Sequence, residues 1–174
     1  MRVLGIDPGL RITGYGCVEG APSDRRGRKA VGPDAVLVEG GVIRLDAKMT
    51  ISARLAELET DLNEIILRLR PDAVAVEKLY AHYKHPTTAI VMGHARGVVL
   101  LAIERARTPG GGRVRLVELG ATEVKKSLTG NGHASKEQMQ RGVQQQLGLP
   151  PHAPPRPADV ADAIAIGLCG LRRG

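Results

Sequence analysis

The chain has 174 residues, 43% of them hydrophobic, and carries 25 Lys and Arg against 18 Asp and Glu, a formal net charge of +7. This size predicts one domain with a buried core, and a domain this basic often binds nucleic acid, although a merely basic surface is the alternative. Cys17 and Cys169 lack the spacing of a zinc site, and there is neither a signal-peptide layout nor an apolar run of about 20 residues. We therefore expect a soluble cytoplasmic protein with free thiols and no membrane segment.

The first quarter of the chain predicts three consecutive strands. Residues 2–7 form a short aliphatic run, and residues 11–20 alternate well enough to be its hairpin partner, with a Pro-Gly turn near the bend. Residues 21–34 are rich in Gly, Pro, Arg and Lys and lack periodicity, which predicts a mobile basic loop. Residues 35–45 supply the third strand of an antiparallel meander.

The middle of the chain predicts two helices that alternate with two strands. Apolar residues recur at three- and four-residue steps over 49–70, which is typical of an amphipathic helix. Residues 72–80 form an apolar strand that we expect to be buried on both faces and parallel to its neighbour. A second long helix covers 86–107, and its small residues in "GHARG" permit close approach to the sheet or to a second subunit. Residues 114–119 are the fifth strand.

The last third of the chain predicts helices. Two shorter ones, 121–130 and 135–148, end at glycines, and a stiff proline-rich connector, 149–157, leads to a closing helix over 158–173. The order of elements predicts an α/β fold with a five-stranded mixed sheet, made of a three-stranded antiparallel meander plus two parallel strands, with helices on both faces. In such a sheet the carboxyl ends of the strands form the natural site.

Four acidic residues are expected to meet at that end of the sheet. Asp7 ends the first strand and Glu77 the fourth, each after an aliphatic run. Asp159 and Asp162 lie three residues apart in the closing helix, so they share one face while the apolar face packs on the sheet. Each has an ordinary explanation taken alone, as a turn former, a solvated strand end, or a helix cap and dipole pair.

The set of four acids from three separate segments is the informative feature. Clustered carboxylates repel one another unless cations lie among them. Oxygen ligands without His or Cys favour Mg²⁺, and Mn²⁺ can be expected to substitute. Two such ions, about 3.5–4 Å apart, can flank a phosphodiester, one generating the nucleophile and the other stabilising the leaving 3′-oxygen.

Five blocks of the sequence resemble the RuvC family of Holliday-junction resolvases over nearly the whole chain. In chain order they read "LGIDPGLRITGYG", "AVEKLY", "GHARGV", "ATEVKKSLTGNGHASKEQM" and "ADVADAIAIGLC". The opening block alone is weak, because other ribonuclease-H-like proteins begin similarly. The five together are specific, and they imply a ribonuclease-H-like fold.

The resemblance also implies an activity and partners. It implies an endodeoxyribonuclease that makes paired, symmetric nicks in four-way junction DNA during recombination and repair, leaving 5′-phosphate and 3′-hydroxyl ends. It implies a homodimer that works with the bacterial branch-migration complex. By motif match, the family's four metal-binding acids correspond to Asp7, Glu77, Asp159 and Asp162. Tyr80 corresponds to an aromatic residue that stacks on a junction base, and Lys125 and Lys136 correspond to residues that contact DNA near the scissile phosphate.

Two features depart from the family pattern. Tyr80 replaces the more usual Phe, and stacking should survive because bases stack on either ring. The basic stretch 21–34 is longer than the resemblance implies, and it is either a source of phosphate contacts or a solvated loop. Tyr80 could instead be ordinary packing, and Lys125 and Lys136 ordinary surface lysines.

Three other functions remain as alternatives. A RuvC-like nuclease of the short YqgF type acts on RNA precursors, but the five-block match disfavours it. An actin-like nucleotide-binding kinase can also contain G-I-D-x-G, but such chains are normally much longer than 174 residues. A module that shapes junctions without cutting has no use for four acids that repel DNA.

Overall fold

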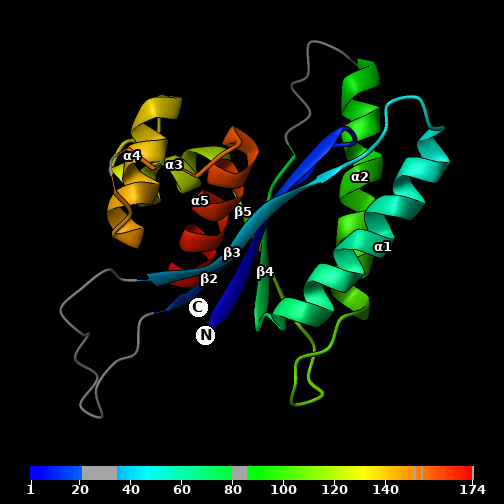
Figure 1. The fold of residues 1–174 in the computed structure, drawn as a ribbon, viewed down its shortest axis with the longest axis horizontal. Coiled ribbons are helices and arrows are strands. Elements are labelled where there is room, and N and C mark those ends of the chain that lie inside the picture. The colour runs from blue at the N-terminus through cyan, green and yellow to red at the C-terminus, as the bar shows by residue number, and fades with distance from the viewer. Residues whose placement is uncertain (21–34, 80–85, 151, 154, 174) are drawn as a thin grey trace.

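The computed structural model describes residues 1–20, 35–79, 86–150, 152–153 and 155–173. The predicted basic loop 21–34 and Tyr80 lie outside the described residues. The chain order of the elements, shown in Figure 1, is β1 (Arg2–Asp7), β2 (Ile12–Gly20), β3 (Ala35–Arg44), α1 (Ile51–Leu69), β4 (Ala73–Glu77), α2 (Pro86–Arg105), β5 (Arg115–Leu119), α3 (Ala121–Thr129), α4 (Lys136–Leu147) and α5 (Ala158–Arg172).

The five strands form one mixed sheet in the order β3-β2-β1-β4-β5. The first three strands are an antiparallel meander, whereas β4 runs parallel to both β1 and β5. The predicted mixed sheet is therefore confirmed, and so is the burial of β4, where Ala73–Val76 are inaccessible to solvent. The strand is shorter than predicted, because it ends at Glu77.

Helices cover both faces of the sheet, as Figure 1 shows, with α1 and α2 on one side and α3, α4 and α5 on the other. Alternate residues of β1 therefore enter different cores. Leu4 and Ile6 pack with α1 and α2, whereas Val3 packs with α5 and its neighbours. Both cysteines are buried and free, as expected.

A row of three glycines lets α5 lie directly on the backbone of the sheet. Gly5, Gly16 and Gly40 are register partners across β1, β2 and β3. A Cβ added to Gly16 would lie 2.9 Å from the Cα of Ile164, and one added to Gly5 would overlap the carbonyl oxygen of Ala163. Glycines in strand interiors mark such close approaches. The row therefore sets how α5 is placed against the sheet.

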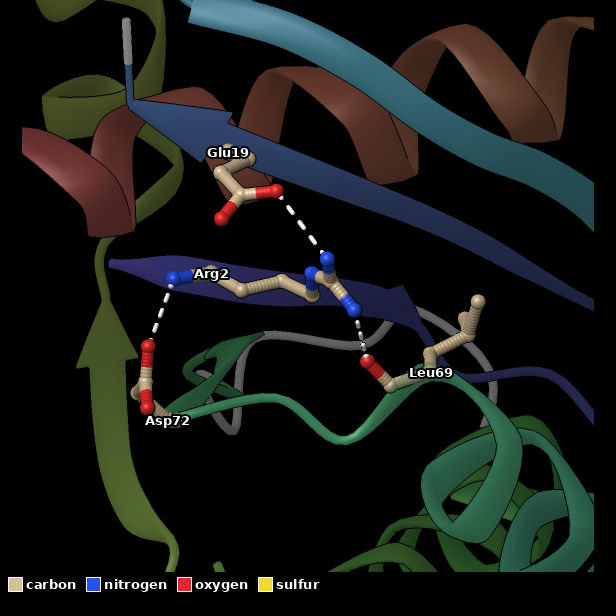
Figure 2. A network of polar contacts seen from close by, with 4 residues as sticks. All are labelled: Arg2, Glu19, Leu69 and Asp72. Atoms are coloured by element: carbon tan, nitrogen blue, oxygen red, sulfur yellow. Dashed lines mark hydrogen bonds and ion pairs between the residues drawn. The ribbon is translucent and has the colours of Figure 1, made fainter. Parts of the chain in front are cut away.

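Arg2 ties together three segments at the other end of β1 (Figure 2). Its backbone N–H donates to Asp72 at 2.7 Å, and its guanidinium donates to the carbonyl of Leu69 at 2.8 Å and to the carboxylate of Glu19 at 3.0 Å. The start of β1 is thereby joined to the end of β2 and to the turn between α1 and β4. These bonds all lie at the opposite end of the strand from Asp7.

Helix α2 covers the sheet with one side and exposes the other. Ala95, Val99 and Ile103 are buried in the core, whereas Ile90 and Leu101 are largely exposed. Within the described chain, Thr87–Arg105 of α2 is the stretch long and apolar enough to cross a membrane by length and composition, a test that helices of ordinary protein cores also pass.

Candidate active site

Asp7 and Glu77 reach the same face of the sheet because they end adjacent parallel strands in register. The β1–β4 ladder closes with Ile6 opposite Val76, so the acids are the next pair along. Side chains alternate between faces along a strand. Since Ile6 and Val76 both enter the core under α1 and α2, the two acids face α5.

Helix α5 brings Asp159 and Asp162 to the same end of the sheet. The carbonyl of Asp159 lies directly over Gly14, where a Cβ would overlap it, so the first turn of α5 rests on bare β2 backbone. Val160 and Ile164 on the opposite face are buried, as predicted. Asp162 and Asp159 are each half-buried at the start of the helix.

A cavity of about 350 Å³ collects three of the acids and both predicted lysines. Asp7, Glu77 and Asp162 line it together with Lys125 from α3 and Lys136 from α4. Asp159 does not line this cavity, although its charge acts on Asp7. A larger cavity of about 650 Å³ is lined by residues of α4 and of the chain just after it, and none of the predicted acids lines it.

The carboxylates disfavour one another's charge. Burial, and then the charges of Asp162, Glu77 and Asp159, raise the pKa of Asp7 from 3.8 to about 7. Burial and Asp162 also raise the pKa of Glu77, and burial raises that of Asp162. A cation bound among carboxylates whose pKa values are raised in this way makes them easier to ionise. The site therefore favours a bound positive charge.

The two lysines supply part of that positive charge. The ammonium of Lys136 lies 3.7 Å from a carboxylate oxygen of Asp162, and its charge offsets part of the rise in the pKa of Asp162 and of Asp7 that burial causes. Lys125 in the same way offsets part of the rise in the pKa of Glu77. Lys136 begins α4 directly after Ser135, whose hydroxyl accepts from the N–H of Gln138 and caps the helix. The side chain of Lys136 is 76% exposed, so it can reach a ligand at the cavity mouth.

The carboxylates of the cavity do not form a closed set of metal ligands. Across the described ranges, no group of three or more Asp, Glu, His or Cys side chains is arranged to hold a metal. Asp162 is paired with Lys136 instead. The donor chemistry nevertheless fits a hard divalent cation, because the cavity offers three carboxylates and neither His nor Cys.

One residue of this region was missed by reasoning from the sequence. Arg96 of α2 is buried, and its guanidinium donates to the backbone carbonyl of Glu77 and to the carboxylate of Glu118 on β5. Within "GHARG" the sequence interpretation considered only the small residues. The available signal was a charged residue adjacent to Ala95 and three positions before Val99, both on the apolar face.

Comparison with known proteins identifies the family. The family model described as "Crossover junction endodeoxyribonuclease RuvC" matches residues 3–170. This chain belongs to the RuvC family. The predicted resemblance is confirmed, and so is the predicted ribonuclease-H-like α/β fold, since the strand order and the structural relatives agree with it.

Relatives of the same name cover nearly the full length. RuvC of Rhodopirellula baltica is 44% identical over 168 residues, which are 97% of this chain and 84% of that protein. The structure of Thermus thermophilus RuvC is 35% identical, with a TM-score of 0.80 over 97% of this chain and 92% of that one. The T. thermophilus protein in complex with Holliday junction substrate is 34% identical, with a TM-score of 0.81 and the same coverage.

Proposed function

We propose that this chain is a metal-dependent endonuclease that resolves four-way DNA junctions by paired nicks. The observation that carries the proposal is the convergence of Asp7, Glu77 and Asp162 on one lysine-flanked cavity in a chain of the RuvC family. Support for the substrate comes from the T. thermophilus relative, which forms a complex with Holliday junction DNA. The net charge of +7 suits a polyanionic substrate.

The cofactor we propose is a pair of Mg²⁺ ions, for which Mn²⁺ can substitute. Asp7, Glu77 and Asp162 would hold them, and Asp159 would join because its charge acts on Asp7. Such ions would activate a water as the nucleophile and stabilise the leaving 3′-oxygen, and the products would carry 5′-phosphate and 3′-hydroxyl ends. Lys136 pairs with one carboxylate oxygen of Asp162 at 3.7 Å, and its exposed ammonium would also be within reach of a phosphate at the same site.

The other residues orient the DNA. Lys125 and Lys136, which both line the cavity, would neutralise the scissile phosphate as it enters. Tyr80, three residues beyond Glu77 in the sequence, is proposed to stack on a junction base. Tyr80→Ala should then slow cleavage more than it weakens binding.

A homodimer would place two such sites on the two strands of one junction. The exposed side of α2 supports this, because Ile90, Gly93, Gly97 and Leu101 follow one another at steps of three and four residues. A Cβ added to either glycine would meet nothing within 4 Å among the residues that the structure describes. Of the small residues in "GHARG", Ala95 packs in the core beneath the helix, whereas both glycines are exposed. The bacterial branch-migration complex is the proposed partner in recombination and repair.

The test compares four-way junction, linear duplex and structured RNA, each with Mg²⁺ or with chelator. We expect symmetric nicks only in the junction and only with metal. Asp7→Asn should abolish cutting and retain junction binding, while Asp46→Asn, at an exposed surface acid, should change neither. Cutting of the RNA instead would favour the RNA-precursor nuclease, and binding without cutting would favour a junction-shaping module.

A further inference from the structure

Arg96 is an almost fully buried cation on the side of the sheet opposite the acids. Only 9% of the residue is exposed, and it belongs to α2, which covers the face shared with α1. The acids face α5 on the other side. Arg96 therefore cannot act by touching a ligand in the acidic cavity, and it does not line that cavity.

The guanidinium bridges the ends of two neighbouring strands. One terminal nitrogen donates to the backbone carbonyl of Glu77 at the end of β4, and the other donates to the carboxylate of Glu118 on β5. A planar guanidinium offers donors in fixed, diverging directions, so one side chain can serve both acceptors, which a single ammonium does less well.

The carbonyl that Arg96 holds belongs to the peptide that carries a candidate metal ligand. Glu77 is the last residue of β4, one position beyond the Ile6–Val76 pair that ends the ladder with β1. On its other side Glu77 is opposite Leu119, and the N–H of Lys78 donates to the Leu119 carbonyl at 2.7 Å. The bond from Arg96 therefore adds an anchor at the point where the chain leaves the sheet.

We propose that Arg96 is a positioning residue, which fixes the main chain of Glu77 so that its carboxylate stays beside Asp7 and Asp162. This inference rests on the proposed function, in which Glu77 binds the metal. Partners that orient metal ligands typically change metal affinity or activity by about 10–100-fold when they are removed. Loss of the bond from Arg96 to Glu77 should therefore weaken metal binding and leave the affinity for DNA unchanged.

The test uses Arg96→Lys, with Arg105→Lys as its matched control on the same helix, where Arg105 pairs with Glu59 at the surface. Mn²⁺ binding to the full-length protein is measured from the loss of the free-ion signal in electron paramagnetic resonance. We expect Arg96→Lys to weaken Mn²⁺ binding by about 10-fold or more, with wild-type circular dichroism and wild-type junction affinity in chelator. Arg105→Lys should match the wild type in all three.

A second variant separates positioning from charge pairing. Glu118→Gln removes the ion pair and leaves the bond from Arg96 to Glu77, so Mn²⁺ binding should stay close to wild type. A loss equal to that of Arg96→Lys would overturn the inference. If Arg96→Lys does not fold, the double variant Arg96→Gln/Glu118→Gln replaces it, because neither member is left as an unpaired charge.

The outcomes also separate this inference from the proposed function. Wild-type Mn²⁺ binding by folded Arg96→Lys overturns the role of Arg96 while leaving junction cleavage intact. A wild type that binds Mn²⁺ but does not cut junctions overturns the proposed nuclease, and the comparison of Mn²⁺ affinities still decides the role of Arg96. A wild type that binds no Mn²⁺, with or without junction, overturns both.

Discussion

Adding one methyl group at Gly16 tests whether the glycine row places the active-site helix. Gly16→Ala puts a Cβ 2.9 Å from the Cα and N of Ile164 and 2.5 Å from its Cγ1, whereas ordinary contact begins at 3.4 Å. The backbone of α5 must therefore retreat by about 0.5 Å, since helix backbone cannot rotate away as a side chain can. Ile164 lies two residues from Asp162, so the carboxylate moves with it.

Two effects of opposite sign set the expected stability change. Alanine is favoured over glycine in a strand interior by about 0.5–1 kcal/mol. Overpacking a filled interior costs about 1–3 kcal/mol. We expect a net loss of about 1–2 kcal/mol, which lowers the melting temperature by about 2–8 °C in a chain of this size. Because a misplacement of 1 Å can cost about 100-fold in rate, a shift of half that size should slow cleavage by about 10-fold.

The assay combines thermal unfolding with single-turnover junction cleavage. Gly5→Ala should be more severe, because its Cβ would overlap main-chain atoms of both Ala163 and Gly167. Gly110→Ala, in the turn after α2, places its Cβ more than 4 Å from every other described part of the chain and should leave both readings unchanged. A Gly16→Ala protein as stable and as active as the wild type would refute the close packing of α5 on the sheet.

Three further predictions concern charge. The pKa of Asp7 is raised to about 7, so between pH 4 and 7 the folded, metal-free protein retains a proton that the unfolded chain has lost, and stability falls as pH rises. Asp7→Asn should therefore stabilise the protein at pH 8 in chelator by about 2–4 kcal/mol and change little at pH 4; an equal gain at both pH values would contradict this. Arg2→Met should lower the free energy of unfolding in urea by about 1–2 kcal/mol without changing cleavage, because Arg2 lies at the opposite end of β1, and an altered cleavage rate would count against that separation. Lys125→Ala should reduce the slope of log binding constant against log salt concentration by about 0.9, as loss of one phosphate contact requires. Lys126→Ala is the control, because Lys126 lies outside the cavity, and it should leave the slope unchanged.

Local patterns predicted most of the fold. The leucine spacing of α1, the aliphatic run of β4 and the glycine stops of α3 and α4 are properties of neighbouring residues, and each element was found within a few positions. The meeting of Asp7 and Glu77 could be predicted because each ends an aliphatic strand, and the ends of neighbouring parallel strands lie at one edge of a sheet. The sequence pattern cannot give the distance between the two carboxylates.

Contacts between distant segments were not predictable in the same way. The bond from Arg96 to Glu77 joins a helix to a strand 19 residues away and leaves no periodic trace. The pairing of Lys136 with Asp162 depends on how α4 and α5 pack, which no single segment encodes. The glycines of β1 and β2 did carry a signal, since glycine inside a strand marks a close neighbour, but the sequence alone could not name α5 as that neighbour.

Helix α5 carries both aspartates near its start, and ten of its other residues are buried between the sheet and the helices α3 and α4. Moving the aspartates away from Asp7 and Glu77 would mean lifting off the sheet the helix that forms the middle of the interior. Loss of cleavage on heating should therefore coincide with cooperative unfolding of the sheet and its helices rather than precede it.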